Sequence, residues 1–118
     1  MEKKERKDKG MKATTANCGE DLVVRVLGDV DHHTSVGLRE EIDRQLAASA
    51  PRRLVLDLSG TEFMDSSGLG LILGRYRKAQ EAGCELVLLR PTSAILRILH
   101  LAGVDGMLTI RQEKGGQV

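Results

Sequence analysis

The sequence predicts an α/β fold in which helices pack on a mostly parallel central sheet. Short aliphatic and β-branched runs alternate with amphipathic segments along the 118 residues, in the order strand, helix, strand, helix, strand, helix, strand. Parallel strands that are joined through a helix form right-handed crossovers in almost all proteins. A chain of this length supports one domain with one hydrophobic core. We therefore expect a single α/β domain.

The first half of the chain predicts an edge strand, a second strand and a helix. Residues 12–18 are expected to form the edge strand, and residues 22–27, LVVRVL, form the first clear strand. The turn GDVDHHT follows, and Thr34 is placed to cap a helix over residues 35–48. The apolar side chains of this helix recur every fourth residue, at Leu38, Ile42 and Leu46.

The second half predicts two further helices between three strands. A strand at 52–58, RRLVLDL, and the turn at 59–65 precede a helix that ends at Gly83, the preferred residue past a helix C-terminus. The expected apolar face of this helix comprises Leu69, Ile72, Leu73 and Tyr76. A strand at 84–89 and a helix that begins after Pro91, capped by Thr92 or Ser93, lead to Gly103 and to a short strand at 107–110.

Turns that leave parallel strands for helices meet at the carboxyl edge of the sheet. In this chain they are the turns at 28–34, 59–67 and 90–92. We therefore expect any functional site to lie on this edge.

Composition excludes several classes of function. The chain has one Phe, one Tyr and no Trp, so it lacks the aromatic platforms on which single-stranded nucleic acid stacks. Its net charge of +1 does not favour general binding to a phosphate backbone. Direct binding to nucleic acid is therefore not expected.

The cysteines and the hydropathy pattern point to a chain of the cytoplasm. Cys18 and Cys84 have neither metal-knuckle nor disulfide-framework spacing, so both are expected to be buried as small apolar residues. No apolar segment reaches the roughly 18 residues of a membrane helix. The N-terminus MEKKERKDKG lacks the apolar run of a secretory signal.

The motif MDSSG opens the second helix and allows two interpretations. Asp65 or Ser66 can simply cap the helix, and Met64 and Leu69 then occupy the positions of a hydrophobic staple. Alternatively, a hydroxyl exposed at a helix N-terminus is accessible to a kinase, and the free backbone N–H groups there can accommodate a phosphate. The carboxylate of Asp65 opposes that phosphate.

Three glycines follow in the first half of the same helix. Each of Gly68, Gly70 and Gly74 costs about 0.8–1 kcal/mol relative to alanine, so a compensating reason is required. Glycine lets another backbone approach closely, and we expect Gly68 and Gly70 to admit a partner at the helix start.

Catalytic and ligand-binding alternatives have weaker support. The side chains of Ser66, Ser67, His32, His33 and Asp31 could meet on the shared edge, but DSSGLG lacks the GxSxG elbow of a serine hydrolase. The adjacent histidines lack a third ligand at metal-site spacing. The glycines match neither GxGxxG after a strand nor a Walker loop.

The segment FMDSSGLGLILGRYRKAQEAG, together with the earlier DHHT turn and the strand RRLVLDL, resembles the anti-sigma F factor antagonists of endospore-forming bacteria, which are single STAS domains. The resemblance covers residues 12–111. It leaves residues 1–11 as a disordered charged lead and residues 112–118 as a polar tail. The family usually closes with a further amphipathic helix, for which RQEKGGQV is too short and too polar.

The resemblance implies an anti-anti-sigma factor that acts by binding and is not an enzyme. The unphosphorylated form binds an anti-sigma factor that is also a serine kinase, and this releases the sigma factor for sporulation transcription. The kinase phosphorylates the first serine of the motif, here Ser66, and a serine phosphatase resets it. ATP and magnesium belong to the kinase, so this chain needs no cofactor or metal. Separately, we expect the free chain to be a monomer.

The same resemblance, carried onto this sequence, implies a set of partner-contact residues: Asp31, Asp65, Ser66, Ser67, Gly68 and Gly70. Two alternatives remain open at this point. One is a STAS regulator of another sigma factor, of the general-stress type. The other is a response-regulator receiver phosphorylated on Asp57, although Arg90 stands where a receiver has lysine and too few strand-helix units precede it.

Overall fold

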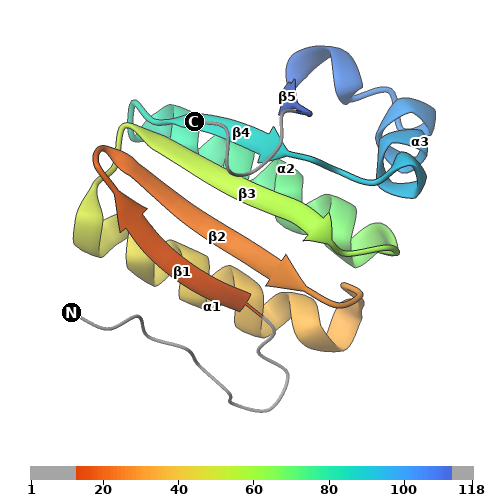
Figure 1. Ribbon diagram of the computed structural model, residues 1–118, viewed down its shortest axis with the longest axis horizontal. Helices are drawn as coiled ribbons and strands as arrows, with labels where there is room; N and C mark the ends of the chain where they lie inside the picture. Colours follow the sequence, from red (N-terminus) through yellow and green to blue (C-terminus); the bar gives the residue numbers. More distant parts are fainter. Residues whose placement is uncertain (1–12, 113–118) are drawn as a thin grey trace.

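The computed structural model describes residues 13–112, and within this range it confirms the predicted α/β class (Figure 1). The elements in chain order are β1 (Ala13–Cys18), β2 (Asp21–Leu27), α1 (His32–Ser49), β3 (Arg53–Gly60), α2 (Ser66–Glu81), β4 (Glu85–Leu89), α3 (Ser93–Leu101), a 3-10 turn η1 (Asp105–Met107) and β5 (Thr109–Arg111). The expected lead at 1–11 and most of the tail at 112–118 lie outside the described residues.

The five strands form one mixed sheet in the order β1-β2-β3-β4-β5. The predicted edge strand β1 pairs antiparallel with β2, and every other neighbouring pair is parallel. In Figure 1, α1 and α2 lie side by side on the same face of the sheet, behind the strands. The chain therefore crosses this face twice before it reaches β4.

The core lies between the sheet and these two helices. On β3, Leu54, Leu56 and Leu58 are at most 2% exposed, and α1 contributes Leu38 and Ile42 from the other side. Burial of one such side chain stabilises the fold by about 1.5–3 kcal/mol. The strands beside β3 add Leu22, Val24, Val26, Leu86 and Leu88 to the same buried cluster, and α3 adds Ile95 and Leu99.

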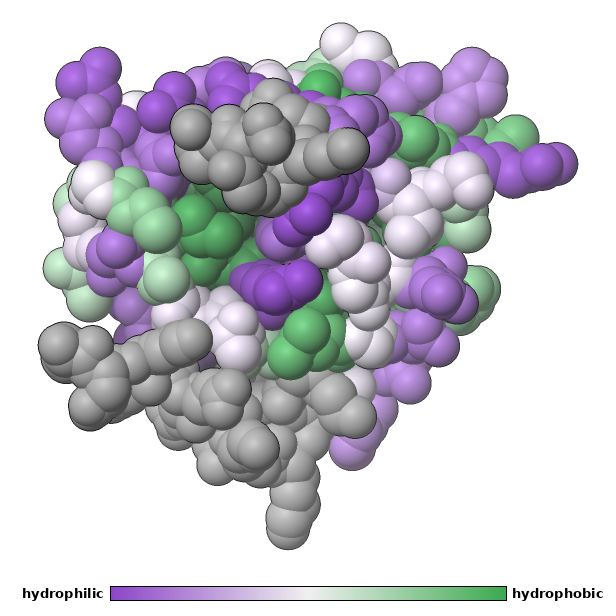
Figure 2. Space-filling model, in the orientation of Figure 1, coloured by the Kyte–Doolittle hydropathy of each residue, from purple (hydrophilic) through white to green (hydrophobic). Residues whose placement is uncertain are grey.

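The opposite face of the sheet carries a charged cluster around Asp57. Arg90 donates to Asp57 at 2.8 Å, Arg25 lies 3.8 Å away, and Ser59 donates through its backbone N–H and its hydroxyl. Burial raises the pKa of Asp57, but the hydrogen bonds from Ser59 and Arg90 outweigh this and hold it below its usual value. Figure 2 views this side of the molecule, where hydrophilic residues stand among hydrophobic ones.

Several predicted boundaries and faces need correction. The apolar face of α2 is turned from the expected one: Leu71 and Ile72 are buried with Gly68, Arg75 and Ala79. Of the four predicted residues, Ile72 alone is fully buried, while Leu69 and Tyr76 pack at the border of the core and Leu73 is half-buried. Gly68 packs against Met64, as described below, so the side of α2 that carries Gly68 faces the core.

The remaining differences lie at the ends of the sheet. The last strand begins at Thr109 and not at 107, because the 3-10 turn η1 occupies Asp105–Met107. Cys84 is buried as expected, but Cys18 is exposed because it ends the edge strand β1. No helix within 13–112 has the length and apolar character to cross a membrane.

Candidate functional site

The turns after β2, β3 and β4 meet at the carboxyl edge of the sheet, as predicted. The N–H of Val30 donates to the carbonyl of Phe63 at 3.1 Å, and the N–H of Asp65 donates to the carbonyl of Val30 at 3.2 Å. The hydroxyl of Thr92 reaches the carbonyl of Thr61 at 3.4 Å. These bonds connect the turn after β3 to the turns after β2 and β4.

The helix α1 begins earlier than expected, and its cap is Asp31 instead of Thr34. The Asp31 carboxylate accepts from the N–H of Thr34 at 2.9 Å, and the Thr34 hydroxyl accepts from the N–H of Asp31 at 3.0 Å. This reciprocal pair is a capping box in which Thr34 is the third helical residue. The hydrogen bond from the Thr34 N–H lowers the pKa of the exposed Asp31 carboxyl below its usual value.

The helix α2 begins beside it with the same type of cap but with different partners. The Asp65 carboxylate accepts from the N–H of Ser67 at 2.8 Å. Ser66, the first helical residue, is exposed, and its hydroxyl makes no hydrogen bond to any residue within 13–112. The Ser66 hydroxyl is therefore free to react or to bind.

The three glycines of α2 have two different environments. A Cβ at Gly68 would lie 2.6 Å from the Cβ of the buried Met64, so Gly68 permits close packing within the chain, where we expected contact with another protein. A Cβ at Gly70 or Gly74 would meet nothing within 4 Å. These two glycines line an open groove of about 410 Å³ between α1 and α2.

The alternative chemistries find little support in the geometry. His32 and His33 are exposed, and in the described part of the chain no group of three or more His, Cys, Asp or Glu side chains is placed to hold a metal. No histidine in this part of the chain hydrogen-bonds to Ser66 as a base would. Asp57 is 5% exposed and bound to Arg90, so it is not placed as a phosphate acceptor.

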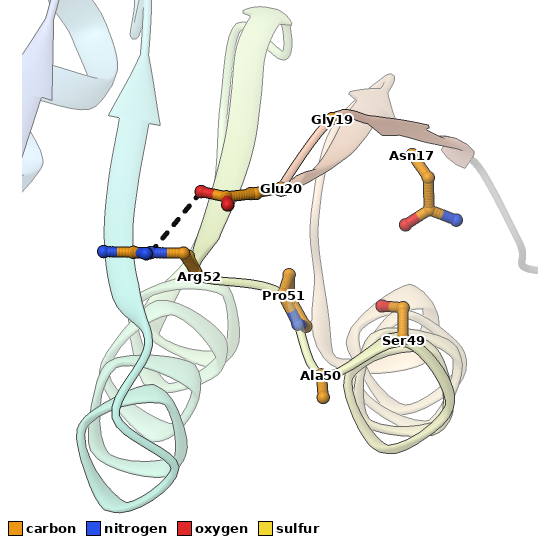
Figure 3. Close-up of a pocket in the computed structure, with 7 residues that line it drawn as sticks. All are labelled: Asn17, Gly19, Glu20, Ser49, Ala50, Pro51 and Arg52. Carbon is orange, nitrogen blue, oxygen red and sulfur yellow. Dashed lines mark ion pairs between the residues drawn. The ribbon is translucent and has the colours of Figure 1, made fainter.

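A second cavity, of about 320 Å³, lies at the opposite edge, where the strands begin (Figure 3). Three of its side chains are already engaged: Glu20 pairs with Arg52 at 3.5 Å, and the Ser49 hydroxyl donates to the carbonyl of Gln45 at 2.9 Å. None of the predicted site residues lines it. The residues that do are Asn17, Gly19, Glu20, Ser49, Ala50, Pro51 and Arg52.

Two features of the carboxyl edge were missed by the sequence analysis. Phe63, directly before the MDSSG turn, is 53% exposed, and Leu27, which pairs with Gly60 at the end of β3, is 39% exposed. Arg75 is 5% exposed in the wall of the groove. The isolated Phe directly before the motif was an available signal, whereas the burial of Arg75 depends on how α1 packs.

Comparison with known proteins places this fold in a family. The model of the STAS domain matches residues 11–115. An anti-sigma F factor antagonist from Paenibacillus polymyxa is 37% identical over 89 residues, which make up 75% of this chain and 76% of that protein. An anti-sigma-B factor antagonist from Bacillus subtilis (strain 168) is 26% identical over 98 residues, or 83% of this chain and 88% of that protein.

A solved structure agrees with the sequence relatives. The Bacillus cell fate determinant SpoIIAA in its phosphorylated form matches with a TM-score of 0.68 at 26% identity, covering 86% of this chain and 92% of that one. The chain therefore belongs to the STAS domain family, and anti-sigma F factor antagonists are among its homologues.

Proposed function

We propose that this chain is an anti-anti-sigma factor that is switched by phosphorylation of Ser66. In its unmodified form it binds an anti-sigma factor with serine kinase activity and releases a sigma factor for sporulation transcription. The observation that carries this proposal is the exposed hydroxyl of Ser66 at the start of α2, which has no hydrogen-bond partner among residues 13–112, in a chain homologous to anti-sigma F factor antagonists. A serine phosphatase would reverse the modification.

The surroundings of Ser66 support a role as acceptor and contact surface. The proposed contacts are Asp31, Asp65, Ser67 and Gly70, which come from the two hydrogen-bonded turns and the first turns of α2. Because these turns are held together, a partner meets a preformed surface and loses little binding energy to ordering it. Gly68 lies beneath this surface, against Met64.

Electrostatics explain why phosphorylation of Ser66 would weaken binding to the partner. A phosphate on Ser66 would carry about −1.5 to −2 charges at pH 7. The exposed carboxylate of Asp31, whose pKa is lowered, and the Asp65 cap already make the adjacent helix starts acidic. A dianion in a fitted interface adds charge and bulk that must be desolvated, so it weakens the complex.

The same geometry favours binding over catalysis. A serine nucleophile needs a base within hydrogen-bond reach, and Ser66 has none within 13–112. Membership of the STAS family excludes the receiver alternative, and Asp57 is buried in its ion pair. We propose no enzymatic activity for this chain.

The experiment measures binding to the anti-sigma factor of the same organism by calorimetry, with sigma factor release followed on native gels. We expect the unmodified chain to bind and release the sigma factor, and Ser66→Asp to bind about 5- to 150-fold more weakly. Ser93→Asp is the matched control, because Ser93 is also an exposed first residue of a helix. Equal affinity for wild type and Ser66→Asp would contradict the charge switch.

A second candidate is a general-stress regulator that acts on a sigma-B type system. The 26% identity to the Bacillus subtilis anti-sigma-B factor antagonist supports it, but the 37% identity to the sigma F type is higher. Binding to an anti-sigma-B factor in preference to an anti-sigma F factor would select this candidate.

A further inference from the structure

The groove between α1 and α2 is lined by a buried arginine, Arg75, whose Nε has no hydrogen-bond acceptor within 13–112. The Arg75 side chain is 6% exposed, and its Nε lies 2.9 Å from an Asp43 oxygen. The orientation of this pair is not that of a hydrogen bond, and both atoms are buried without a hydrogen-bond partner in the described part of the chain. Buried polar groups are hydrogen-bonded in the great majority of proteins, and a guanidinium offers five N–H donors.

Positive charge exceeds negative charge around this groove. Asp43 is shared between Arg75 and Lys78, which lies 4.0 Å from its second oxygen. Arg39 is exposed on the wall of the groove and has no ion-pair partner within 13–112. Burial lowers the pKa of Arg75, the Asp43 carboxylate opposes this, and the nearby charge of Arg39 lowers it further. An additional carboxylate here would be paired with cations on both sides.

The shape of the groove fits a helix. Gly70 and Gly74 lie one turn apart on α2, and neither would place a Cβ within 4 Å of another atom, so the α2 backbone is bare along the groove. Helix axes approach most closely where the contact residues are small. Val36, which is 39% exposed, and Leu71 supply apolar wall. A helix laid in a groove contacts it through side chains at i, i+3, i+4 and i+7.

We propose that this groove receives a helix of the anti-sigma partner that carries an acidic side chain, whose carboxylate accepts hydrogen bonds from Arg75 and pairs with Arg39. This inference rests on the proposed function and extends its contact surface away from Ser66. It also gives the two open glycines of α2 a purpose, because a side chain at either position would fill the space that the partner helix occupies.

The test measures affinity for the cognate anti-sigma factor with Gly74→Leu and Arg39→Glu. We expect each variant to bind about tenfold more weakly or worse, since the first fills the groove and the second reverses its charge. The controls are Gly106→Leu, another site where a Cβ meets nothing within 4 Å, and Arg97→Glu, an exposed arginine of α3. Both controls should bind as wild type does.

Folding is checked with Gly74→Ala, which should raise the melting temperature, because the helix gains an alanine without any clash. Wild-type affinity for Gly74→Leu would overturn the groove as the docking site. If Arg39→Glu bound with wild-type affinity, the proposal that the partner helix carries an acidic side chain would be wrong. In either case tight binding by wild type would leave the proposed function intact, whereas a wild-type chain that fails to bind would refute the proposed function itself.

Discussion

The first turns of α1 and α2 lie side by side and share an aspartate cap, yet they use their hydroxyl groups differently. In α1 the third helical residue is Thr34, and its hydroxyl accepts from the N–H of Asp31 and closes the capping box. In α2 the third helical residue is Gly68, which has no side chain to offer. The N–H of Asp65 instead donates to the carbonyl of Val30 in the neighbouring turn.

Because of this difference, the hydroxyl of Thr34 has a structural role, whereas the hydroxyl of Ser66 is available to react or to bind. Thr34 is committed to holding the start of α1, while the Ser66 hydroxyl has no partner within 13–112. The close approach of Met64 excludes any side chain at Gly68, so α2 cannot close a box of the same kind. The start of α2 is therefore fixed by the Asp65 cap and by backbone contacts with the neighbouring turn, and neither uses the Ser66 hydroxyl.

The largest expected effect comes from adding a side chain at the third position of α2. Gly68→Ala places a Cβ 2.6 Å from the Cβ of Met64, which is 2% exposed and cannot move away without repacking. Overpacking of this kind costs about 1–3 kcal/mol, more than the helix gains from alanine. Urea denaturation should show this loss, with the slope m unchanged.

The matched variant is Gly74→Ala in the open half of the same helix, for which urea denaturation should show higher stability than wild type. If Gly68→Ala were as stable as wild type, the packing account of Gly68 would be wrong, and its role would return to partner contact.

A smaller effect should separate the two hydroxyl groups. Thr34→Ala removes one half of the capping box and should cost about 1 kcal/mol. Ser66→Ala removes an exposed hydroxyl that has no partner in the described range and should change stability by less than about 0.5 kcal/mol. Thermal unfolding of both variants at one pH measures this contrast. A loss for Ser66→Ala as large as that for Thr34→Ala would show that Ser66 has a structural role.

Much of the fold could be predicted from the sequence, because its signals are local. The alternation of strands and helices, the glycine after α2 and the convergence of the turns all follow from periodicity and turn residues, and the structure agrees. The start of α1 was missed because Asp31 and Thr34 both suit a helix N-terminus. Only the reciprocal bonds between them decide which residue is the cap.

The candidate site was harder to predict, because its properties depend on tertiary contacts. The MDSSG motif located Ser66, but the opposite environments of Gly68 and Gly74 follow from which side of α2 faces Met64. Spacing alone placed Leu73 on the apolar face, and no local pattern indicates that a helical arginine, Arg75, is buried between two helices. Such features depend on how α1 and α2 pack together.

The most direct test of the central claim is the location of phosphate after incubation with the cognate anti-sigma factor and ATP, read by mass spectrometry. The account predicts one phosphate on Ser66 in the wild type and in Ser67→Ala, and none in Ser66→Ala. Phosphate on Ser66→Ala, or on Ser67 alone in the wild type, would contradict it.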